Sequence, residues 1–188
     1  PLKVAEGRVE LAQEECESEH LIAIGNALDR MRTLIEDMLT LAREGDTVAE
    51  YENTSLESVI NESWTTVDTA EASLHVENEQ TVQADSTRLR QVFENLFRNA
   101  VEHAGEDVSI VVGELDEGFY VADNGPGIPE DQRDEVFEVG YSTEATGTGF
   151  GLSIVEEIID AHKWQIRVTD GAEGGARFEI TGVELGTA

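Results

Sequence analysis

The chain has 188 residues, 39% of them hydrophobic, and 41 acidic against 12 basic side chains give a formal net charge of -29 at pH 7. This acidic excess argues against nucleic acid as a direct partner, because phosphate contacts need clusters of Lys and Arg. No apolar run approaches the ~20 residues of a membrane-spanning helix, no signal-peptide pattern is present, and the one cysteine, Cys16, excludes an intrachain disulfide.

Residues 1–45 are predicted to form a helical hairpin. Apolar side chains recur every three or four residues over 21–42 and, upstream, over 2–16, which is the pattern of helices in a bundle. A hairpin this short cannot bury both apolar stripes alone, whereas a four-helix bundle built from two chains would bury them. We therefore favour a homodimer; the alternative is that both helices pack on the rest of the chain. Gly45 is a suitable αL cap for the second helix.

Residues 46–188 are predicted to form a second domain. Weak alternation over 48–54 favours a strand, Ser55 can cap a helix that runs to Val67, and 130–137 looks helical. The remaining elements are strands at 73–77, 81–84, 108–115, 118–123, 165–170 and 176–181, and helices at 86–104 and 152–162. The fold class is therefore α+β: the hairpin is followed by a two-layer α/β sandwich, whose mixed, mostly antiparallel sheet is covered by helices on one face.

Three short stretches carry candidate chemistry. Asn95 and Asn99 share one helical face and flank its apolar arc, where an amide can serve a ligand oxygen or a metal ion without adding charge. Asp123 ends a strand before Gly125 and Gly127, so its carboxylate can accept from a purine amino group while the glycines let backbone approach. Glycines at 147, 149 and 151 lead into a helix, which favours an anion site. Taken singly, these stretches are also compatible with backbone-bonded amides, a plain turn and a flexible loop.

Together and in this order, these stretches are similar to the motif set of one family. QVFENLFRNAVEH (91–103) resembles its N box, DNGPG (123–127) its first glycine box, VFEVGYST (136–143) its phenylalanine box and GTGFGL (147–152) its second glycine box. Over about residues 1–182 the chain resembles a sensor histidine kinase of two-component signalling, with a dimerisation hairpin and a Bergerat-type (HATPase) ATP-binding domain.

The resemblance implies ATP and Mg²⁺ as cofactors. Asn99 would be the metal ligand, with Asn95 and His103 beside it, and a neutral amide suits an ion that also binds anionic phosphates. Asp123 would accept from the adenine amino group in a pocket shaped by Gly125 and Gly127. The phosphates would be held at the helix start by Gly147, Thr148, Gly149, Gly151 and Leu152. Residues 130–146 would form a mobile lid.

The chain departs from the family at its basic positions and at its first helix. Many relatives carry Lys or Arg where this chain has Glu102, and Arg98 is the nearest basic side chain to the asparagines in sequence. The dispersed acidic excess favours a salt-rich, halophilic cytoplasm over a surface for basic partners, and we hypothesise that Mg²⁺ and salt supply the missing positive charge. The chain starts at Pro1 rather than Met, at what look like the last two residues of the phosphoacceptor motif, so we expect a fragment without the acceptor histidine.

The resemblance thus implies an ATP-dependent protein-histidine kinase core that cannot phosphorylate itself in the usual way, and that has no catalytic acceptor of its own. The parent kinase would transfer the γ-phosphoryl group to a histidine and on to a response-regulator aspartate. Two alternatives remain: another ATPase of the same fold, such as a topoisomerase subunit, a mismatch-repair protein or a heat-shock chaperone, and a non-catalytic dimerisation scaffold with a vestigial nucleotide site.

Overall fold

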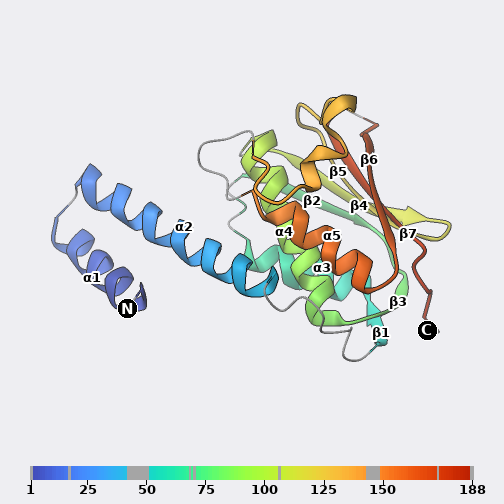
Figure 1. The fold of residues 1–188 in the computed structure, drawn as a ribbon, viewed down its shortest axis with the longest axis horizontal. Coiled ribbons are helices and arrows are strands. Elements are labelled where there is room, and N and C mark those ends of the chain that lie inside the picture. Colours follow the sequence, from blue (N-terminus) through green and yellow to red (C-terminus); the bar gives the residue numbers. More distant parts are fainter. Residues whose placement is uncertain are drawn as a thin grey trace.

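The computed structural model of the chain describes residues 2–16, 18–41, 51–67, 69, 71–105, 107–142, 149–172 and 174–186. The chain begins with α1 (Leu2–Glu15) and α2 (Glu19–Leu41), two helices that pack against each other and project from the remainder of the molecule (Figure 1). Gly45 and the expected domain boundary at 45/46 lie outside the described residues. No helix in the described part of the chain is long and apolar enough to cross a membrane.

A five-stranded sheet forms one layer of the second domain. Its strands are β2 (Ser73–Glu77), β4 (Ser109–Leu115), β5 (Gly118–Asp123), β7 (Ala176–Thr181) and β6 (Gln165–Asp170), in that spatial order. Only the β2–β4 pair is parallel, and the other three pairs are antiparallel. The prediction of a mixed, mostly antiparallel sheet is therefore confirmed.

A second, two-stranded sheet was not predicted. It pairs β1 (Glu52–Ser55) with β3 (Thr81–Ala84) in antiparallel register. The consecutive strands β2 and β3 therefore belong to different sheets. The alternation of apolar and polar residues identifies each as a strand but says nothing about its partner.

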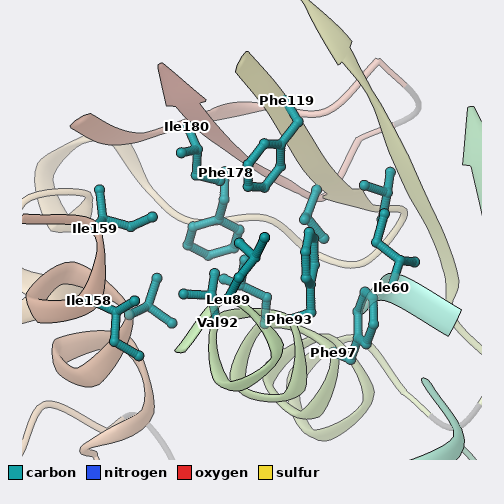
Figure 2. Close-up of a cluster of buried hydrophobic side chains, with 14 of the residues drawn as sticks. Ile60, Leu89, Val92, Phe93, Phe97, Phe119, Ile158, Ile159, Phe178 and Ile180 are labelled. Carbon is teal, nitrogen blue, oxygen red and sulfur yellow. The ribbon is translucent and has the colours of Figure 1, made fainter. Parts of the chain in front are cut away.

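Three helices cover one face of the large sheet, as predicted: α3 (Leu56–Thr66), α4 (Ser86–Ala104) and α5 (Gly151–Ala161) (Figure 1). Ser55 caps α3 through its side chain, and Asp85 caps α4. The apolar faces of the helices meet the inward side chains of β5 and β7 in one core (Figure 2). Its largest members include Ile60, Leu89, Phe93, Phe97, Phe119, Ile159 and Ile180.

The prediction of a helix over 130–137 is wrong. The segment instead forms two short 3₁₀ helices, η1 (Glu130–Gln132) and η2 (Glu135–Phe137). Val136 and Phe137 of the second are buried in the core, which ties the segment to α5. Short 3₁₀ turns commonly serve as connectors, whereas an amphipathic helix would bury residues three or four positions apart.

Candidate functional site

The candidate phosphate and metal region lies where α4 meets the start of α5. A Cβ atom added at Gly151 would lie 3.4 Å from Asn95 Oδ1 and 3.5 Å from Asn99 Oδ1. The first residue of α5 therefore lies beside both amides of the N box, with room for no more than one methyl group between them. The free backbone N–H groups at the start of a helix carry partial positive charge, which attracts anions. The structure thus places two neutral amides beside a helix N-terminus.

The two asparagines differ in their surroundings. Asn95 is only 4% exposed, and its Nδ2 donates to Gln91 O at 3.0 Å. The sequence predicts that it flanks the apolar face, whereas in the structure it is buried. The cause is α5, whose packing covers that side of α4. Asn99 is partly exposed, and its buried Nδ2 has no hydrogen-bond partner among the described residues. Leaving a buried N–H donor unpaired costs roughly 1–3 kcal/mol, and an acceptor such as water or a phosphate oxygen would satisfy it while the amide oxygen is available to a cation.

These residues fit a magnesium ion that is shared with phosphates. No group of three or more His, Cys, Asp or Glu side chains gathers to hold a metal in the described ranges. A Mg²⁺ ion beside Asn99 would therefore take most of its ligands from water and a nucleotide, which is how proteins usually bind it.

Asp123 is held in one orientation at the end of β5. Its Oδ1 accepts from the backbone N–H groups of Gly125 at 2.8 Å and of Ala176 at 3.2 Å. Both bonds go to one oxygen, so Oδ2 is left to accept from a ligand amino group. Burial raises the pKa of this carboxyl, while the two backbone N–H groups and the charge of His103 act in the opposite direction. His103, an exposed residue in the last turn of α4, is therefore close enough to act on Asp123 electrostatically.

Glycines around Asp123 allow the backbone to come close. A Cβ at Gly125 would lie 2.2 Å from Ala104 Cβ, and Gly127 has a φ of 74° and abuts Gly175 O. Gly175 was not identified as a site residue from the sequence. It has a φ of 74°, and a Cβ there would lie 2.1 Å from Asp123 O and 2.5 Å from Oδ1. The pair Gly174–Gly175 is the sequence feature that could have pointed to this position, but only the folded chain brings Gly175 against Asp123.

The second glycine box is described in part. Gly147 and Thr148 lie outside the described residues, as do 143–146 of the expected lid. Gly149 has a φ of 71°, and its carbonyl accepts from Gly140 N at 2.9 Å, so positions 140 and 149 are joined by a backbone hydrogen bond. Leu152 is partly buried and packs against the hydrophobic core.

The other side chains considered from the sequence lie elsewhere. Arg98 lies near Glu94. Burial raises the pKa of the Glu94 carboxyl, and the charge of Arg98 opposes this shift. His20 and His75 are exposed, and His162 is buried at the end of α5.

Comparisons with known proteins identify the family of the chain. Residues 84–185 match the family described as histidine kinase-, DNA gyrase B-, and HSP90-like ATPase. The chain is 31% identical over 169 residues to the sensor histidine kinase ZraS of Klebsiella oxytoca, covering 84% of this chain and 36% of that protein. It is 31% identical over 196 residues to sporulation kinase A of Bacillus subtilis, covering 96% of this chain and 32% of that protein. The chain therefore spans about a third of the length of these curated relatives.

Solved structures resemble the fold as well. Full-length ShkA in complex with AMPPNP superposes with a TM-score of 0.73 at 26% identity, over 100% of this chain and 44% of that one. The catalytic domain of histidine kinase ThkA gives a TM-score of 0.59 at 30% identity, over 70% of this chain and 93% of that one.

Proposed function

Because this chain belongs to the family of histidine kinase-, DNA gyrase B- and HSP90-like ATPases and is the ATP-binding core of a sensor histidine kinase, we propose that the whole protein transfers the γ-phosphoryl group of Mg-ATP to a histidine and then to a response-regulator aspartate. The acceptor histidine would lie outside these 188 residues. The observation that supports this most is the close approach of Gly151, at the start of α5, to the side-chain amides of Asn95 and Asn99.

The residues divide the work of binding. Asn99 would hold Mg²⁺, with Asn95 supporting it from the buried side, and the start of α5 would take the phosphates. Asp123 Oδ2 would accept from the adenine amino group, and the charge of His103 would favour the ionised form of this carboxylate. Phosphoryl transfer depends mostly on positioning and on neutralising charge, so a site of this kind is sufficient in principle.

The partners follow from the same proposal. Helix α1 exposes Val4 and Leu11, and α2 exposes Ile22, Ile24, Met31 and Ile35. A second copy would cover this apolar surface in a four-helix bundle. The receiver domain of a response regulator would be the second partner. We further propose a cytoplasmic site of action at high salt, since the net charge of -29 is self-repulsive in dilute buffer.

Binding of Mg-ATP to the chain, measured by calorimetry from low to molar KCl, tests these proposals. Asn99→Asp should weaken binding, whereas Asn61→Asp, which adds the same charge at an exposed position of α3, should leave it unchanged. Absence of binding in molar salt by a folded chain would favour a scaffold with a vestigial site. Affinity that falls monotonically with KCl would refute the proposed role of salt.

A longer chain that extends upstream to the expected histidine tests the transfer step. We expect acid-labile phosphate from labelled ATP on that chain. Its absence, with ATP binding intact, would contradict the kinase proposal while leaving the nucleotide site in place.

A further inference from the structure

His162 joins the far ends of the two helices that meet at the candidate phosphate site. It is the C-cap of α5 and is only 3% exposed. Its Nδ1 lies 2.7 Å from Ile158 O, and its Nε2 accepts the backbone N–H of Asp85 at 3.1 Å. Since Nε2 accepts, Nδ1 carries the proton and the ring is neutral in this arrangement.

The partner of His162 is the residue that begins α4. Asp85 is the N-cap of that helix, and its side chain accepts from the backbone N–H groups of Thr87 at 3.0 Å and Arg88 at 3.2 Å. A single imidazole therefore connects the last residues of α5 to the cap of α4. The bond is partly buried and the imidazole itself is buried, so leaving it unmade is costly and it helps to fix the relative position of the two ends.

The opposite end of α5 is at the nucleotide site. The helix spans Gly151–Ala161, which is about 16 Å at 1.5 Å per residue. Gly151 lies against Asn95 and Asn99 of α4, and His162 holds the other end to the start of the same helix. Because a short helix moves nearly as a rigid body, a shift of α5 along α4 at His162 would also move Gly151 relative to the two amides.

The surroundings of His162 keep it an acceptor. Burial lowers the pKa of the imidazole, Ile158 O and the Asp85 charge raise it, and the Arg88 charge lowers it. Trp164 lies beside the ring with centroids 4.6 Å apart, and Tyr51 contacts it edge-on at 5.7 Å. Both aromatic contacts hold the plane of the ring.

We propose that His162 is a positioning residue for the phosphate and metal half of the nucleotide site, holding α5 where Gly151 meets Asn95 and Asn99. The inference rests on the proposed ATP-binding function. It separates the two halves of the site, because the two hydrogen bonds that orient Asp123 come from the backbone of Gly125 and Ala176, which lie outside α5. Loss of the His162 contact should therefore weaken binding of the phosphates and leave adenosine binding unchanged.

Two substitutions separate the roles of the ring nitrogens. In His162→Asn the side-chain amide still reaches Ile158 O but is too short to accept from Asp85. In His162→Gln the amide oxygen occupies the place of Nε2 and can restore that bond. His75→Gln, at an exposed position of β2, is the control.

We expect His162→Asn to raise the Kd for Mg-AMPPNP roughly tenfold, equivalent to about 1.4 kcal/mol, with His162→Gln recovering most of that loss. The Kd for adenosine should stay within about twofold of wild type in both. Equal losses for Mg-AMPPNP and adenosine, or no loss for either, would overturn the proposal, since a merely structural histidine would not discriminate between the two ligands.

The side-chain amide signals of Asn95 and Asn99 in nitrogen-15 NMR spectra give a second readout, in the absence of nucleotide. They should move in His162→Asn and return toward their wild-type positions in His162→Gln. If the wild-type chain binds no nucleotide, the ATP-binding proposal fails, and these signals alone decide the positioning role. Unchanged signals in His162→Asn would contradict it.

Discussion

Replacing Gly175 by Ala should destabilise the fold and also disturb the adenine-binding role proposed for Asp123. The backbone there has a φ of 74°, a conformation that costs an L-residue with a Cβ about 1–2 kcal/mol. The new methyl group would also lie 2.1 Å from Asp123 O and 2.5 Å from its Oδ1. Relieving an overlap with backbone typically costs a further 1–3 kcal/mol. The sum predicts a loss of about 2–5 kcal/mol in the free energy of unfolding.

Gly182 offers a matched control. Its φ is 75°, but the nearest atom to an added Cβ is Trp164 Cα at 3.9 Å. Gly182→Ala therefore carries the backbone cost alone, about 1–2 kcal/mol. The difference between the two variants measures the clash with Asp123.

Urea unfolding followed by circular dichroism gives both free energies, and calorimetry gives the Kd for Mg-ATP. Gly175→Ala should bind more weakly, because the clash moves the carboxylate that is expected to accept from adenine, while Gly182→Ala should bind like wild type. If the two variants lose the same stability, or if Gly175→Ala binds ATP normally, the proposed fit of Gly175 against Asp123 is refuted.

Three further outcomes concern backbone strain and charge. Lys163 has a φ of 62°, so Lys163→Gly should raise the unfolding free energy by about 1 kcal/mol in urea, and a loss would contradict the assignment of strain. Burial lowers the pKa of His162 below its unfolded value, so the unfolded chain binds the proton more readily and the stability should fall as the pH drops below about 6.5. Subtracting the urea stability of His162→Gln from that of the wild type between pH 8 and 5 isolates the contribution of His162. A difference that does not change with pH would refute this prediction. Burial raises the pKa of Asp123, so its ionised form costs stability at neutral pH, and Asp123→Asn should unfold at higher urea while binding Mg-ATP more weakly; a less stable variant would reverse this reasoning.

Local sequence was sufficient to place α4. Its wide apolar arc predicts a helix over 86–104, and the helix spans Ser86–Ala104. Ser55 likewise caps α3, as predicted. Capping and periodicity are properties of neighbouring residues, so a single sequence reports them directly.

Contacts between distant segments were beyond that reasoning. Helical periodicity predicts Asn95 at the edge of the apolar face of α4, yet α5 packs over this residue and buries it. Gly175 acquires its role only because β7 lies beside β5. The role of His162 likewise depends on a partner 77 residues away in the chain. Each depends on the packing of whole elements, which the pattern of one segment does not encode.

The hydrogen bond between Gly140 N and Gly149 O joins two residues on either side of positions 141–148. Each doubling of the chain length between two joined residues costs only about 0.6 kcal/mol of loop-closure entropy. Insertion of a few residues between positions 140 and 149 should therefore change the stability of the fold little. The bond fixes the course of the chain again just before α5 begins at Gly151.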